Sequence, residues 1–158
     1  MRKWLFCAAA VVLAAALGYM PFSGSDVAIL QPVELIRVDR IDDIVTVQTD
    51  TGDMGKGESA QYAFIDLKKT TAGEVFLDTA DFLLLGTDAM PLLQELTQIL
   101  RPACRVCIVQ GEVDLKAAAE SLRTRQENVT LQQYRTGKGN IPRLIMDKER
   151  MRLVWEEG

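Results

Sequence analysis

Cys104 and Cys107 are the residues whose type and spacing come nearest to a redox motif, since they form a C-x-x-C pair. Such a pair is reactive where it opens a helix, because the backbone N–H groups there stabilise a thiolate. Here Ile108 and Val109 follow, so we expect the pair at the entry to a β-strand, where residues three apart point to opposite faces. Buried, unreactive thiols are the favoured interpretation, and a small exported redox protein that uses Cys104 and Cys107 is the alternative.

Histidine is absent from all 158 residues. Because histidine is the usual general base near neutral pH and the commonest metal ligand, its absence excludes Ser-His-Asp and Cys-His catalysis. Two cysteines alone also cannot complete a structural zinc site. We therefore expect no enzyme activity, no catalytic residues, no bound metal and no cofactor.

Two further patterns fail as sites on their spacing. Asp78 and Asp81 resemble a catalytic carboxylate pair, but three positions apart on an extended chain they would point to opposite faces, so turn or capping roles are favoured. Residues 50–57 contain three glycines but lack the Gly-Lys-Ser/Thr of a phosphate loop and the alternating acids of an EF-hand. We expect this stretch to be a loop that leads into a helix capped by Ser59.

The elements that would position these residues are centred on residues 55–102. Gly73 can close the helix that begins after Ser59. Next, residues 74–86 contain a continuous apolar run typical of a strand buried on both faces, and Thr87 or Asp88 is expected to cap a second helix. The buried stripe of the first helix is predicted to be Ala60, Ala63, Phe64 and Leu67, and that of the second Leu92, Leu93, Leu96, Ile99 and Leu100.

Strands are predicted on both sides of this unit. The pattern indicates a strand over residues 27–39 with a bend or edge at Pro32, and a return strand over 44–49. After residue 102 we expect a strand over 105–110, a helix capped by Asp114, a polar loop over 126–140 with a brief helical turn, and a terminal hairpin formed by 141–146 and 150–155. The fold class is therefore α/β or α+β, with a mixed sheet of about four to six strands covered by about three helices.

The N-terminal segment, residues 1–22, has the pattern of an export signal. Arg2 and Lys3 precede an unbroken apolar run over 4–17. With the next five residues, the run reaches about the thickness of a bilayer core.

Two interpretations of this segment stay open. Ala16-x-Gly18 fits the cleavage site of a signal peptide, which would release a secreted or envelope protein. Alternatively, the chain stays in the cell membrane through residues 4–22 as a signal anchor, with its body outside. In both, residues 23–158 form a single exported domain.

Composition limits the class of partner. The chain carries a formal charge of −4, and 48% of its residues are hydrophobic, which is ordinary for a globular domain of this length. The acidic balance argues against nucleic acid and against an anionic bilayer surface as primary partners.

The order of these elements resembles the N-terminal domain of Ger(x)C-type spore germination proteins, the C subunits of nutrient germinant receptors. The resemblance implies a membrane-associated or exported envelope protein of a spore-forming, Firmicutes-like bacterium, which acts in spore germination or sporulation by contact with other envelope or membrane proteins, germinant receptor subunits among them. It is carried by Val45-Thr46-Val47-Gln48, Gly57-Glu58-Ser59, Phe82-Leu83-Leu84-Leu85-Gly86, residues 92–102, Val109-Gln110-Gly111-Glu112, Ile141-Pro142-Arg143-Leu144 and Arg152-Leu153-Val154-Trp155.

Overall fold

The computed structural model describes residues 30–125, 129–147 and 150–155. The predicted signal segment, residues 1–22, lies outside these ranges, and within them no helix combines the length and apolar character that a membrane crossing requires. The described elements are, in chain order, β1 (Leu30–Pro32), β2 (Leu35–Ile41), β3 (Ile44–Thr49), β4 (Met54–Gly57), α2 (Ala60–Thr70), β5 (Glu74–Phe76), the 3₁₀ turns η2 (Leu77–Thr79) and η3 (Thr87–Leu92) around β6 (Phe82–Gly86), α3 (Leu93–Ile99), β7 (Arg105–Val109), α4 (Leu115–Arg123), β8 (Val129–Thr130), α5 (Leu131–Arg135), β9 (Arg143–Asp147) and β10 (Arg150–Val154).

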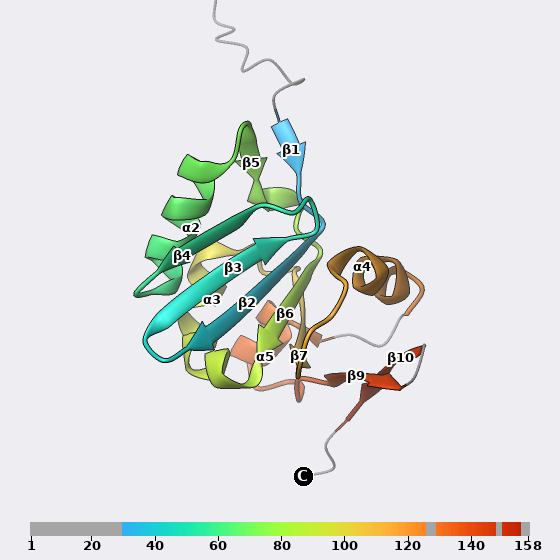
Figure 1. The fold of residues 1–158 in the computed structure, drawn as a ribbon. Helices are drawn as coiled ribbons and strands as arrows, with labels where there is room; N and C mark the ends of the chain where they lie inside the picture. Colours follow the sequence, from blue (N-terminus) through green and yellow to red (C-terminus); the bar gives the residue numbers. More distant parts are fainter. Residues whose placement is uncertain (1–29, 126–128, 148–149, 156–158) are drawn as a thin grey trace, which may run out of the picture.

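The main sheet is mixed and has eight strands among the described residues (Figure 1). Its order is β10-β9-β7-β6-β2-β3-β4, with β8 pairing β7 beside β9. The contacts β2–β6, β6–β7 and β7–β9 are parallel, whereas β2–β3–β4 and β9–β10 are antiparallel. The predicted α/β class and the terminal hairpin are confirmed, but the sheet has more strands than expected and four described α-helices accompany it.

The sheet carries a hydrophobic core on each face. On one face, α2 and α3 pack over alternate residues of β2, β3, β6 and β7, such as Ile36, Val47 and Leu83. On the other face, α4 covers Leu35, Leu84 and their neighbours on β6 and β7. Every residue of β6 is buried, as the apolar run predicts for a strand covered on both faces.

Two helix starts form where the sequence indicates them. The Ser59 hydroxyl accepts a hydrogen bond from the Tyr62 N–H at the start of α2, and the Asp114 carboxylate accepts from Lys116 N–H and Ala117 N–H at the start of α4. The buried positions of α2 are Ala60, Ala63, Phe64 and Leu67, as predicted.

The sequence predicts a loop over residues 50–57, but the structure shows a loop only in the first half of this stretch. A turn ends at Asp53, and the next four residues form the edge strand β4, which pairs with β3. A Cβ on Gly55 would lie 2.3 Å from the Ala63 carbonyl oxygen, and one on Gly57 would lie 2.6 Å from the Ala63 nitrogen. These glycines therefore let α2 lie directly against the strand.

Several expected boundaries are also wrong. Residues 74–86 form two strands separated by η2, and β5 pairs in parallel with β1 in a separate two-stranded sheet. Neither Thr87 nor Asp88 caps α3, because a 3₁₀ turn that contains Pro91 comes first, and proline cannot donate the backbone bond of a regular helix. Gly73 does not close α2, since the chain is already extended at Thr71.

Candidate functional site

The main sheet has a switch point between β6 and β7. The connection after β6 leads to α3 on one face, while the connection after β7 leads to α4 on the other face. In open α/β sheets the crevice at the carboxyl ends of two such strands is the usual place for a ligand. Here that crevice opens onto a part of the sheet that α4 does not cover, formed by β3, β4 and the residues of β2 that follow the buried Leu35 (Figure 1).

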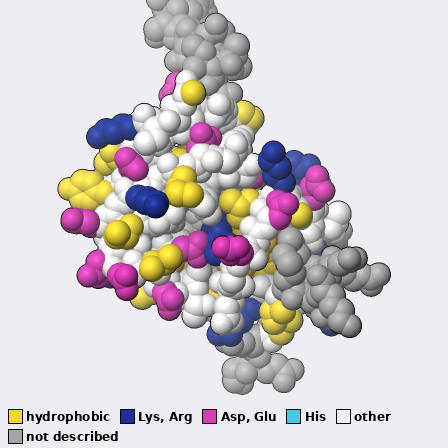
Figure 2. Space-filling model, in the orientation of Figure 1, with side chains coloured by type: hydrophobic (Ala, Val, Ile, Leu, Met, Phe, Trp, Pro, Cys, Tyr) yellow, Lys and Arg dark blue, Asp and Glu magenta, His cyan; other side chains and the backbone are white. Residues whose placement is uncertain are grey.

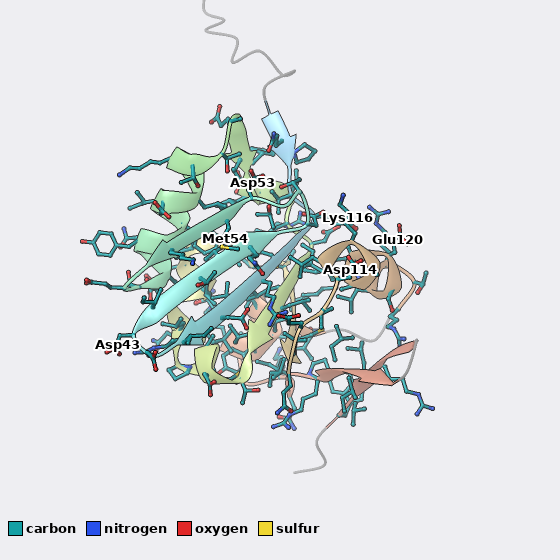
Figure 3. All side chains as sticks on the ribbon, viewed as in Figure 1. Asp43, Asp53, Met54, Asp114, Lys116 and Glu120 are labelled. Carbon is teal, nitrogen blue, oxygen red and sulfur yellow. The ribbon has the colours of Figure 1, made fainter. Side chains whose placement is uncertain are left out.

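A groove of about 870 Å³ occupies this place. We call it the switch-point groove. In Figure 3, Met54 on β4 and Asp114 at the start of α4 lie on its two sides. It is lined by Arg37, Asp39, Arg40 and Ile41 of β2, Thr46 and Gln48 of β3, Met54 and Lys56 of β4, residues 86–88 from the end of β6 onward, and residues 109–114 from the end of β7 onward.

The floor of the groove follows from the strand register. Directly opposed residues of antiparallel strands share a face, so the register sets cross-strand rows of side chains. Next to the turn between β2 and β3, Ile41 lies opposite Ile44, and both side chains are more than half exposed. The other two rows of this face are Arg37-Gln48-Met54 and Asp39-Thr46-Lys56. Figure 2 shows the resulting mixture of hydrophobic and charged side chains on the front of the molecule.

Arg37 connects the sheet to the loop after β7. Its guanidinium forms an ion pair with Asp39, two residues along β2, and donates to the Gly111 carbonyl oxygen at 2.9 Å. The side chains of Arg37 and Asp39 are only 13% and 24% exposed, so the pair is poorly screened by solvent. Gly86 lies against the same carboxylate, because a Cβ there would be 2.4 Å from Asp39 Oδ1.

Three other charges of the groove are not neutralised within the described part of the chain. Lys56 is on the β4 side, while Asp88 and Glu112 are in the loops after β6 and β7. Their side chains form no ion pair or hydrogen bond with any described residue, and all three residues are exposed. The groove therefore offers a cation at the β4 edge of its floor, which we call the β4 wall, and two anions in the loops on the opposite wall.

The two cysteines predicted as a redox pair do not meet in this groove. Cys104 belongs to the core under α2 and α3, and Cys107 belongs to the core under α4, so the sheet separates them as the spacing predicts. Both are free and fully buried. Removal from water raises the pKa of each thiol to about 12, against a smaller opposing effect of nearby arginines.

Asp78 and Asp81 are also not a pair. The prediction treats the two residues as part of one extended chain, but Asp78 lies in the 3₁₀ turn η2, which ends before Asp81. Asp81 forms an ion pair with Arg101, whose guanidinium also donates to the Ala80 carbonyl oxygen at 2.9 Å. Arg101, in the segment after α3, therefore contacts two residues immediately before β6.

The residues of the groove were not singled out as a site from the sequence. Arg37, Asp39 and Lys56 come from three strands of the sheet, and only the pairing of these strands brings them together. A usable signal was the alternation of polar residues with buried ones along β2, which marks a strand with one solvated face. Comparisons of the chain with protein-family models, with curated proteins and with solved structures gave no significant match.

Proposed function

We propose that this chain is a non-enzymatic envelope protein that acts by binding another protein in the switch-point groove. The observation that carries the proposal is the set of charges that the described residues leave unpaired, with Lys56 on one wall and Asp88 and Glu112 on the other. Beside them, Ile41 and Ile44 are 69% and 54% exposed. Apolar side chains rimmed by charges are typical of a protein contact surface.

The shape of the groove favours a protein partner over a small molecule. A small ligand is usually bound in a concave, mainly apolar pocket that covers most of its surface. Here the floor is one face of a three-stranded sheet, and its rows of side chains continue to the β2–β3 turn. A partner segment along the floor can contact Ile41 and Ile44 as well as the charged walls.

The charges of the groove indicate which charged side chains the partner should carry. A basic side chain beside Asp88 and Glu112 and an acidic one beside Lys56 would neutralise all three groups. Such pairs contribute more to specificity and association rate than to affinity, so we expect the exposed apolar side chains Ile41, Ile44 and Met54 to supply most of the binding free energy.

Site-specific photo-crosslinking in the native cell tests this assignment. A photoreactive phenylalanine analogue replaces Thr46, which lies in the middle row of the floor, and in a matched variant it replaces Tyr134 on α5, an exposed residue outside the groove. We expect the Thr46 variant to give one discrete cross-linked protein, which Lys56→Glu reduces at least several-fold. No product at Thr46, or the same product at both positions, would contradict the proposal.

The biological setting is proposed from the resemblance to germinant receptor C subunits. The partner would then be an envelope or membrane protein of the receptor, identified by mass spectrometry of the cross-linked product. A strain that lacks this chain should form spores with slowed nutrient germination, restored by the wild-type gene and not by the Lys56→Glu variant. Normal germination of the deletion strain would exclude this setting without excluding the groove as a binding site.

Export is the remaining part of the proposal. Arg2 and Lys3 ahead of the apolar run would keep the N-terminus inside, so residues 23–158 would lie outside the membrane. Alkaline phosphatase fused after Gly158 should therefore be active, because it folds only after export. An inactive fusion, together with an active cytoplasmic reporter at the same position, would place the body inside the cell.

A further inference from the structure

The two edges of the main sheet are built differently. At β4, side chains of α2 occupy the outward backbone groups: the Asp66 carboxylate accepts from the Lys56 N–H at 2.9 Å, and the Thr70 hydroxyl donates to the Met54 carbonyl oxygen at 3.0 Å. An edge closed in this way cannot pair with another strand.

The opposite edge, β10, has no such cover from the described residues. β10 pairs only with β9, and no described helix side chain bonds to its outer backbone groups. Apolar side chains surround this edge, since Ile145, Val154 and Trp155 are 45%, 41% and 39% exposed. Proteins normally protect such an edge, and an open apolar edge is a template for another strand.

We propose that β10 pairs antiparallel with β10 of a second copy of this chain, so that the two main sheets join into one across a two-fold axis. Such an axis is perpendicular to the sheet and preserves its faces, so each residue pairs with one on the same face of the other strand. Only registers centred on a single residue meet this condition.

The sequence selects among these registers. Centred on Leu153, the pairing sets Arg152 opposite Val154 of the second copy, and Met151 opposite Trp155. Centred on Arg152 or Met151, the pairing would set arginine against arginine, which is unfavourable for directly opposed residues. Among the registers centred on Met151, Arg152 and Leu153, we therefore assign the one at Leu153.

This contact is separate from the proposed function. The switch-point groove involves β2, β3 and β4, whereas β10 is at the far edge of the sheet (Figure 1). Each copy would therefore keep its groove accessible. Because the pairing strands have only five residues, the interface is small, and we expect a dissociation constant in the micromolar range, on the order of 1–100 μM.

Sedimentation of the full chain measures the association. The protein is studied in detergent with micelles in large excess, so that a shared micelle does not produce a false dimer. We expect a reversible dimer, and Val154→Lys should raise its dissociation constant about tenfold or more by placing lysine opposite Arg152 of the second copy. Because Val154 also faces Arg143 of β9 in the same chain, circular dichroism should show that the monomer of this variant keeps the wild-type fold. The matched control is Ile44→Lys, at another exposed apolar residue, which should leave the dimer unchanged.

Mixed disulfide formation tests the register. In a Cys7→Ser background, an equal mixture of Arg152→Cys and Val154→Cys chains should give far more cross-linked dimer than either variant alone. A monomer throughout the accessible concentrations, or equal yields from the mixture and the single variants, would overturn the assignment. Loss of the dimer with Ile44→Lys but not with Val154→Lys would move the contact to the groove and would equally overturn it.

Discussion

Gly55 on β4 lies so close to Ala63 on α2 that a single added carbon would come within 2.3 Å of the Ala63 carbonyl oxygen. The obstructing atoms belong to the helix backbone, which cannot move aside as a flexible side chain would. The edge strand and its covering helix are thus in contact because this residue has no side chain.

We therefore expect Gly55→Ala to destabilise the protein by about 1–3 kcal/mol or more, through overpacking. Urea unfolding followed by circular dichroism measures the change. Lys56→Ala, at the next residue but exposed, is the control and should alter the free energy of unfolding by less than about 0.5 kcal/mol. Equal effects would mean that α2 does not lie directly on β4.

Arg37 should fix the loop that borders the switch-point groove. Arg37→Met keeps most of the side-chain length but removes the ion pair with Asp39 and the bond to the Gly111 carbonyl oxygen. We expect a loss of about 1–3 kcal/mol, since a poorly exposed carboxylate loses its partner. Hydrogen exchange should become faster at residues 110–113. Arg40→Met, which breaks an exposed pair with Asp43 and a bond to the Asp42 carbonyl oxygen within the β2–β3 turn, should leave it unchanged. Unchanged exchange in the Arg37 variant would show that the loop is held by other contacts.

Substitution of Leu84 tests the hydrophobic core between the main sheet and α4. It is fully buried in β6 and packs under α4, so Leu84→Ala should cost about 2–5 kcal/mol. Lys69→Ala in the last turn of α2 is the exposed control, expected to cost less than about 0.5 kcal/mol. Thermal or urea unfolding of both variants makes the comparison, and similar losses would contradict the assignment of β6 as the central strand.

Local signals in the sequence predicted the elements that local physics determines. The caps at Ser59 and Asp114 satisfy backbone N–H groups within three residues, and the buried run in β6 is legible in four consecutive residues. By contrast, the sequence predicts a loop where β4 forms, because glycine normally favours turns. The contact that requires Gly55 comes from Ala63 of α2, eight positions later.

The candidate site could not be predicted for a related reason. Arg37 and Gly111 are 74 positions apart, and they meet only because β2, β6 and β7 are neighbours in the sheet. Residue types give the strands and their burial, but strand order depends on which apolar faces pack together. The direction of the chain after β6 and β7, which creates the switch point, is likewise a property of tertiary packing.

The closed edge at β4 should be needed for solubility. Asp66→Ala together with Thr70→Val removes both side-chain partners of the outward backbone groups of β4. We expect a modest loss of stability, about 1 kcal/mol per hydrogen bond, and concentration-dependent aggregation that light scattering detects. Lys68→Ala, an exposed change on the same helix, should remain soluble. Full solubility of the double variant would show that α2 is not what protects this edge.

Cys104 and Cys107 should make the protein less stable at alkaline pH. Burial raises the pKa of each thiol from an ordinary value near 9.0 to about 12 in the folded state. Between these values the unfolded chain releases the thiol protons and the folded chain retains them, so the free energy of unfolding falls as pH rises. The stabilising contribution is thus complete below about pH 9 and is lost towards pH 12, by up to about 1.4 kcal/mol per thiol per pH unit.

Urea unfolding under reducing conditions at pH 7 and pH 10 measures this loss, with a Cys104→Ser, Cys107→Ala variant as the control. The wild type should lose more stability between the two pH values than the variant, in which neither position titrates. In a Cys7→Ser background, alkylation with iodoacetamide at pH 7 should be slow in the folded protein and fast in urea, because a buried thiol forms little thiolate. Fast alkylation of the folded protein, or an equal pH dependence in both proteins, would contradict buried thiols and favour the redox alternative for this pair.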